Sequence, residues 1–121
     1  MKAQITIRHL PNPLLSPNAR CHWLAKNRAT QQLKEEVHYL ALEAKIPKFK
    51  AAIVQYKFVL PDKRSRDIDN LQISLKPAID ALTNLGIFPD DSYKFLTYAP
   101  TTVEVSPTKE AKVIITIKGE A

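Results

Sequence analysis

Residues 52–60 read AIVQYKFVL and are followed by Pro61. One alternating set of side chains in this stretch is apolar or aromatic throughout: Ala52, Val54, Tyr56, Phe58 and Leu60. The other set holds Ile53, Gln55, Lys57 and Val59. Alternation with a period of two is typical of a β-strand, and apolar residues in both sets indicate that this strand is largely buried. Pro61 closes the strand because it has no N–H to donate.

A helix is predicted after the charged segment DKRSRDIDN, residues 62–70. Its apolar residues recur at helical spacing: Leu71, Leu75, Ala78, Ile79, Leu82 and Leu85. That spacing places one apolar stripe along a single face of a helix. Gly86 follows where a left-handed C-cap is wanted, so the helix is expected to end just before it.

Two sequence features refine this helix. Asp69 and Gln72 form a D-x-x-Q capping box, which predicts that the helix begins at Asn70. Pro77 lacks the N–H that would bond back to the preceding turn. We therefore expect the helix to kink near Lys76 or to restart there.

The flanking sequence supplies the other elements. Residues 3–9 alternate between apolar and polar side chains, which predicts a half-buried strand. From about Arg28 to Lys45, apolar residues recur at helical spacing and predict an amphipathic helix. A weak strand is expected within residues 94–105 and a strong one over residues 112–118. The predicted order is β-α-β-α-β-β.

This order favours the α+β class. We expect a single domain over residues 1–121, with a mixed sheet of about four strands packed on one side by two helices. A chain of 121 residues provides one hydrophobic core and, by default, one active site.

Composition narrows the class of function. Lys and Arg outnumber Asp and Glu by 18 to 12, giving a net charge of +6, which favours polyanionic partners such as nucleic acid. No apolar run approaches a membrane span, and the start lacks a secretory signal, so a soluble cytoplasmic protein without membrane contact is expected. The lone Cys21 has no partner spacing for zinc or an internal disulfide.

Acidic residues gather near the predicted helix. Asp67 and Asp69 lie two residues apart, and in an extended segment both side chains point to the same side, where they could hold one hard cation. Asp90 and Asp91 follow Gly86 in a turn, and a helix that returns the chain beside its own start could bring one of them to the same place. These residues predict a site for Mg²⁺, with Mn²⁺ as a substitute.

Basic residues lie next to these carboxylates. Lys63, Arg64 and Arg66 are placed to seat a phosphate, and Lys76 could reach the scissile phosphate or the leaving oxygen. Phosphodiester cleavage needs an activated water and neutralisation of the charge that develops at phosphorus. Carboxylates that bind a metal, together with cations that bind phosphate, are suited to that reaction.

Ordinary structural roles compete with these interpretations. Asp69 as an N-cap would contribute about 1 kcal/mol, and Asp67 could pair with Arg64 or Arg66 on the surface for less. Asp90 and Asp91 suit a turn for local reasons. Trp23 could stack on a base, although a buried anchor for the preceding loop is favoured. The three histidines, His9, His22 and His38, show no paired spacing and are interpreted as surface or boundary residues.

Several motifs together resemble one family. These are SPNARCHW (16–23), RDIDNLQ (66–72), a lysine four residues before the aspartate of DALTNLGIF (80–88), and PDDS (89–92). In this order they resemble the RusA-like family of Holliday junction resolvases. The resemblance implies a homodimeric endonuclease that binds four-way DNA junctions and makes paired, magnesium-dependent nicks. It also implies that Asp67, Asp69 and Asp91 are the essential acids and that Lys76 is the required lysine.

The sequence departs from the family at one place. The stretch between Asn70 and Lys76 is about three residues longer, which would rotate a continuous helix by about 300° and move the lysine about 4.5 Å along it. The alternatives are a non-catalytic nucleic-acid-binding module and a nuclease that acts on RNA or on other branched DNA, such as flaps and forks.

Overall fold

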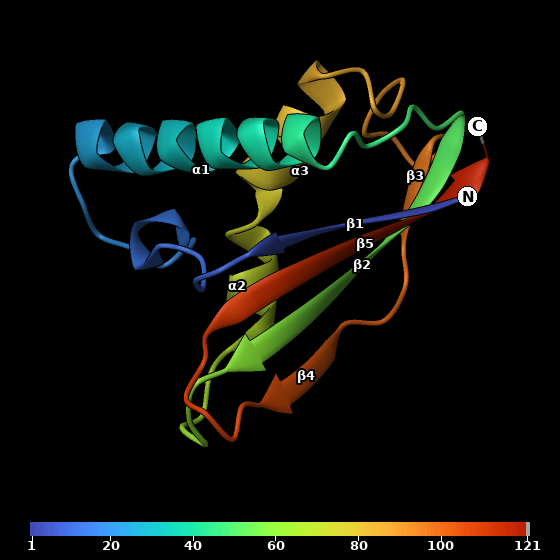
Figure 1. The fold of residues 1–121 in the computed structure, drawn as a ribbon. Coiled ribbons are helices and arrows are strands. Elements are labelled where there is room, and N and C mark those ends of the chain that lie inside the picture. The colour runs from blue at the N-terminus through green and yellow to red at the C-terminus, as the bar shows by residue number, and fades with distance from the viewer. Residues whose placement is uncertain (121) are drawn as a thin grey trace.

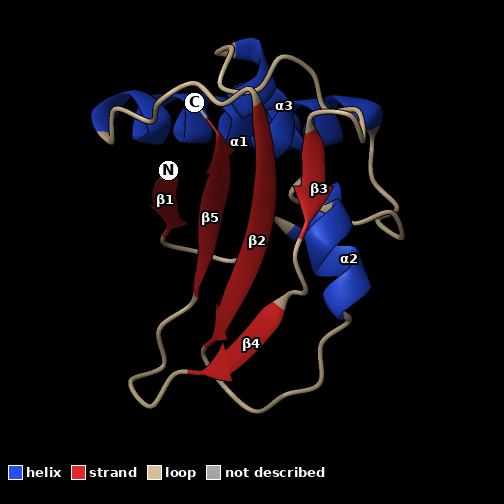
Figure 2. Ribbon diagram, turned by 90° about the vertical axis from the view of Figure 1, so that its right-hand side faces the viewer, coloured by secondary structure: helices blue, strands red, loops and turns tan. Residues whose placement is uncertain are grey.

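The computed structural model describes residues 1–120, which form one sheet with its helices gathered on one side (Figures 1 and 2). The order along the chain is β1 (Lys2–Ile7), the short 3-10 helix η1 (Pro13–Leu15), α1 (Trp23–Glu43), β2 (Ala51–Leu60), α2 (Ile68–Ile73), α3 (Lys76–Asn84), β3 (Leu96–Tyr98), β4 (Thr102–Val105) and β5 (Lys112–Glu120). The predicted α+β class and mixed sheet are confirmed. None of the helices within these residues is long and apolar enough to cross a membrane.

Strand β2 lies at the centre of the sheet and is paired along both edges. On one edge β5 pairs with it antiparallel, and β1 in turn pairs antiparallel with β5. On the other edge β3 and then β4 pair with it in parallel, so the sheet is mixed. The chain between β2 and β3 therefore forms a crossover, and α2 and α3 lie within that crossover.

The weak strand expected within residues 94–105 is two short strands rather than one. The interruption falls at Pro100, which has no N–H for the ladder. The Ala99 N–H still bonds the Val54 carbonyl at 2.9 Å, and the Gln55 side-chain amide donates to the Pro100 carbonyl at 2.9 Å. The sheet thus has five strands instead of about four, and a side chain of β2 bridges the gap.

The core lies between the sheet and the helices. The apolar alternating set of β2 is buried throughout, and Phe58 is fully enclosed. In the other set only Val59 is buried, so the predicted burial of this strand is confirmed for one of its two faces. Helix α1 contributes one stripe, formed by Ala29, Leu33, Val37 and Ala41. No helix among residues 1–120 covers the opposite face of the sheet, where Ile53 is 49% exposed (Figure 2).

Helix α1 starts earlier than predicted, at Trp23 instead of about Arg28. The first turn contributes nothing to the buried stripe, so apolar periodicity gave no sign of it. At the other end, Lys45 adopts a left-handed φ of 52°, and the Ile46 N–H bonds the Ala41 carbonyl at 3.1 Å. This is a Schellman ending, which stops the helix at Glu43.

The second predicted helix is two helices, as the position of Pro77 indicated. Helix α2 ends at Ile73, and α3 begins at Lys76. Pro77 lies in the first turn of α3, where an N–H would have no partner within the helix, so its absence costs no hydrogen bond. At the far end Gly86 takes the predicted left-handed conformation, with φ of 77°. The predicted start at Asn70 was wrong, because α2 begins at Ile68.

The one-sided packing predicts different costs for two substitutions in β2. Phe58→Ala should lower the free energy of unfolding by about 3–5 kcal/mol, because it opens a cavity in the core. Ile53→Ala, on the uncovered face of the same strand, should change it by less than about 1 kcal/mol. Urea denaturation of both variants measures this, and equal losses would contradict the one-sided core.

Candidate functional site

Three charged side chains meet at the start of α3: Lys76, Asp80 and Asp91. The Lys76 Nζ lies 3.2 Å from the Asp80 Oδ1, one helical turn along α3, and also bonds the Asp91 Oδ2. The loop after α3 supplies Asp91. Ile87 and Phe88, both buried, anchor this loop after the turn at Gly86 and direct the chain back towards the beginning of α3. The structure therefore brings together two of the residues named from the sequence, Lys76 and Asp91, and adds Asp80.

The electrostatics of this cluster fix its charges. The hydrogen bond from Lys76 holds the pKa of the Asp91 carboxyl below its usual value. The same bond to Asp91, followed by the one to Asp80, raises the pKa of Lys76 despite partial burial. At neutral pH, Asp91 is therefore ionised and Lys76 is protonated. Lys76 can neutralise an anion there but cannot accept a proton as a base.

The two aspartates of the D-x-D motif occupy different places on α2. Asp67 is the N-cap, with an extended backbone, and its Oδ1 accepts a hydrogen bond from the Asn70 N–H at 3.2 Å. Asp69 lies inside the first turn. The predicted capping box does not form, because the Gln72 side chain instead accepts a hydrogen bond from the Thr101 hydroxyl.

The two aspartates are related to different cavities beside α2. Asp67 lines a hollow of about 550 Å³ together with Arg64 and Arg66. Asp69 shares a helical face with Gln72 and Ile73, three and four residues on, and both of these line a different cavity. Helical spacing therefore associates Asp69 with the cavity that Lys76 also lines, and Asp67 lines the other hollow.

No ready-made metal centre is present among residues 1–120, where no group of three or more His, Cys, Asp or Glu side chains is arranged to hold an ion. Asp90 stabilises the turn in which it lies, since its Oδ1 accepts a hydrogen bond from the Ser92 N–H at 2.9 Å. The carboxylates that do converge are those of Asp80 and Asp91, on the ammonium group of Lys76. Asp80 was not predicted as a site residue, although its four-residue step from Lys76 was visible.

Of the basic residues before α2, Arg66 is held in an ion pair, and the side chains of Lys63 and Arg64 are exposed. The Arg66 guanidinium pairs with Asp62 at 3.1 Å, and the same Asp62 oxygen accepts from the Arg64 N–H at 3.0 Å. The surface pairing of Asp67 with an arginine, one of the ordinary roles considered for it, is therefore replaced by pairing of Asp62.

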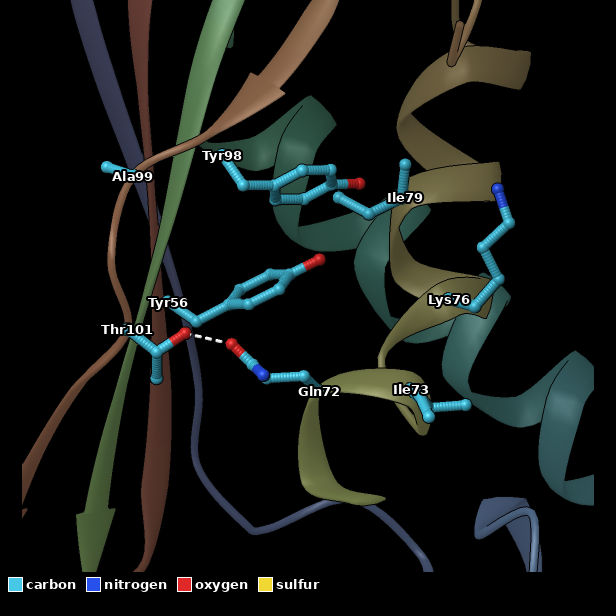
Figure 3. A pocket seen from close by; sticks show the side chains of 8 residues that line it. All are labelled: Tyr56, Gln72, Ile73, Lys76, Ile79, Tyr98, Ala99 and Thr101. Carbon is cyan, nitrogen blue, oxygen red and sulfur yellow. Dashed lines mark hydrogen bonds between the residues drawn. The ribbon is translucent and has the colours of Figure 1, made fainter. Parts of the chain in front are cut away.

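A cavity of about 460 Å³ opens beside the Lys76 cluster, between α2–α3 and the strand interruption at Pro100 (Figure 3). Its walls include Tyr56, Gln72, Ile73, Lys76, Tyr98 and Thr101. The aliphatic stem of Lys76 lines the cavity, and its ammonium group points away from it. Burial raises the pKa of both tyrosines, so both hydroxyls stay protonated and neutral at physiological pH.

The structure also shows the surroundings of Trp23, His22 and His9. Trp23 is 64% exposed, so the favoured interpretation as a buried anchor was wrong. Its ring stacks against His22, whose Nδ1 accepts from the Leu24 N–H and caps α1. His9 pairs with Glu36 at 2.7 Å. His9 and His22 thus have structural roles at the surface.

The capping geometry predicts which aspartate stabilises α2. Asp67→Ala should lower the free energy of unfolding by about 1 kcal/mol. Asp67→Asn should keep most of the stability that the cap contributes, because an amide oxygen also accepts from the Asn70 N–H. Asp69→Ala should cost less, about 0.5 kcal/mol, through the helix dipole alone. A larger loss for Asp69→Ala than for Asp67→Ala in chemical denaturation would contradict the assigned cap.

The Lys76–Asp91 pair predicts a measurable titration. The Asp91 carboxyl should titrate below its ordinary value, so the pair contributes to stability above about pH 4 and loses that contribution as the pH falls through the lowered pKa. In Lys76→Met the midpoint should move up towards the ordinary value. Carbon-detected NMR measures this, with Lys94→Met as a control of equal charge change, and an Asp91 midpoint unmoved by Lys76→Met would refute the pairing.

Comparison with protein-family models gives no match, and no curated protein matches the sequence significantly. The assignment of a function therefore depends on the residues themselves and on their arrangement.

Proposed function

We propose that this protein is a magnesium-dependent, structure-selective endonuclease that resolves four-way DNA junctions by paired nicks. The observation that carries the proposal is the exposed cluster in which the Lys76 ammonium joins the carboxylates of Asp80 and Asp91. Asp69 lies in the first turn of α2, the helix before α3, and the motifs that resemble the RusA-like family run through all of these residues.

The donor set suits a hard cation. Asp80 and Asp91 already converge on one positive charge, and carboxylate oxygens are the ligands that Mg²⁺ and Mn²⁺ prefer. Asp91 and Asp80 would hold the ion with Asp69, while Asp67 would join them only by giving up its bond to the Asn70 N–H. Asp90 would join only by giving up its bond to Ser92. When bound, the ion supplies an acidified water and neutralises charge on the phosphate.

The chain's own residues would position and neutralise the substrate. If the carboxylates were shared with an ion, the Lys76 ammonium would be free to pair with a phosphate oxygen. A carboxylate left free of the ion could accept the proton of the attacking water. Lys63 and Arg64, both exposed, would contact the DNA backbone, with Arg66 held by Asp62 behind them.

A homodimer would match the substrate. A four-way junction has approximate two-fold symmetry, and a C₂ dimer presents one acidic cluster to each of two equivalent strands. The net charge of +6 on each chain supports binding to this dense polyanion.

A non-catalytic binding module is the second candidate, and one observation favours it. Lys76 already neutralises both Asp80 and Asp91, so the cluster is satisfied without a metal. Such a module would bind branched DNA equally well with and without a divalent ion, and it would never cut.

Cleavage of a synthetic four-way junction tests the enzyme. The native chain should nick opposite strands with Mg²⁺ or Mn²⁺ and lose all activity with chelator. Asp91→Asn and Asp69→Asn should each reduce the rate at least about 100-fold while leaving binding intact, because each removes a charge that holds the ion. Asp69→Asn leaves the cap of α2 in place, which makes its fold easy to verify.

Matched substrates and a control variant complete this experiment. Glu43→Gln, at the exposed end of α1, should keep full activity. Linear duplex, flap, fork and RNA substrates identify the preferred branch. A native chain that binds the junction and leaves it intact with every divalent metal would establish the binding module instead.

A further inference from the structure

The cavity beside Lys76 exists because two chain interruptions meet at it. One is the break between α2 and α3, which leaves Ile73 54% exposed, and the other is the break at Pro100 between β3 and β4, which leaves Tyr98 53% exposed. Each break forgoes regular backbone bonding and leaves apolar surface in water. The result is a hollow of about 460 Å³, within the range of small-molecule sites.

The walls of this cavity combine an aromatic surface with a few polar groups. The rings of Tyr56 and Tyr98 lie 5.9 Å apart and tilted by 42°, with Tyr98 the more exposed (Figure 3). Gln72 uses its amide oxygen on the Thr101 hydroxyl. Its amide nitrogen makes no hydrogen bond within residues 1–120 and remains available for a polar ligand edge, whereas the hydroxyls of Tyr56 and Tyr98 interact with each other.

The cavity and the charged cluster are parts of one surface. Lys76 belongs to both, since its stem lines the cavity and its ammonium contacts Asp80 and Asp91. Tyr98 is close enough to Lys76, Asp91 and Asp80 that all three influence the pKa of its hydroxyl. The flat aromatic part of a ligand could lie against the tyrosine rings in the cavity. An anionic part of the same ligand, outside the cavity, could then contact the ammonium group of Lys76.

We propose that this cavity receives one unstacked nucleobase of the bound nucleic acid, with Tyr98 as the stacking surface and the Gln72 amide against the base edge, while the adjoining phosphate meets Lys76. Every base has a face that stacks on an aromatic ring, so Tyr98 supplies affinity without regard to sequence. The amide of Gln72 can add a preference among bases. This inference rests on the proposed nuclease function and specifies its substrate as nucleic acid with an unpaired or easily unpaired nucleotide at the cleaved position.

Binding measured without cleavage tests the proposal. Fluorescence anisotropy with chelator present would give the Kd for four-way junctions that carry a single abasic site, moved one nucleotide at a time across the branch point. Tyr98→Ala should weaken binding of the intact junction about 5- to 100-fold. For the native protein, one abasic position should cause a comparable loss, and at that position Tyr98→Ala should cause no further loss.

Two matched variants separate stacking from general effects. Tyr98→Phe keeps the ring and should bind within about twofold of the native protein. Tyr93→Ala removes a tyrosine that is 80% exposed and outside the cavity, and should leave both affinity and the abasic pattern unchanged. If Tyr98→Ala binds as tightly as Tyr93→Ala, or if its loss simply adds to that of every abasic position, the cavity does not hold a base.

The outcomes distinguish this inference from the function on which it rests. Coupling between Tyr98 and one abasic position, in a protein that never cuts, would uphold the base site and refute the nuclease. Magnesium-dependent cutting without such coupling would refute the base site and uphold the nuclease. Absence of any binding to junction DNA or to single-stranded oligonucleotide would overturn both.

Discussion

The pairing of β2 along both of its edges is the constraint on which the rest of the structure depends. Its antiparallel partner β5 extends along nearly all of it and carries β1, while the opposite edge is shared by the short strands β3 and β4. Parallel pairing on that edge requires a crossover, and the crossover is the part of the chain that holds α2, α3 and the charged cluster. The site is therefore attached to the most deeply buried strand of the molecule.

The same pairing explains where the structure is open. A single long strand beside β2 would close the sheet edge, but Pro100 cannot join the ladder, and the edge divides into two short strands. A single long helix above that edge would cover the gap, but Pro77 is compatible with a helix only near its start, so α3 begins anew at Lys76. Both prolines act locally, and because the crossover places them opposite each other, their effects combine into one cavity.

Much of the fold follows from periodicity in the sequence. The alternation in residues 52–60 and the apolar stripe from Ala29 to Ala41 both reflect burial against a single core, and both predicted their elements correctly. Helix starts were predicted less well. Two overlapping caps compete at α2, and Asp67 with Asn70 prevails over Asp69 with Gln72, because Gln72 finds a tertiary partner in Thr101 that lies far away in the sequence.

The candidate site shows the same division between local and tertiary information. The step from Lys76 to Asp80 is one helical turn and could be derived from the sequence. The contact from Lys76 to Asp91 depends on the turn at Gly86 and on the burial of Phe88, which direct the loop back to the helix start. Hydrophobic periodicity in the sequence carries no information about this tertiary contact.

The ion pair at Lys76 gives the carboxylates of this surface a stable arrangement without a metal. Asp80 and Asp91 carry like charges at short range, and their repulsion would spread them apart if no cation lay between them. Lys76 supplies that cation from within the chain. The same two contacts hold the ammonium group outside the cavity, while the aliphatic stem of Lys76 lines it.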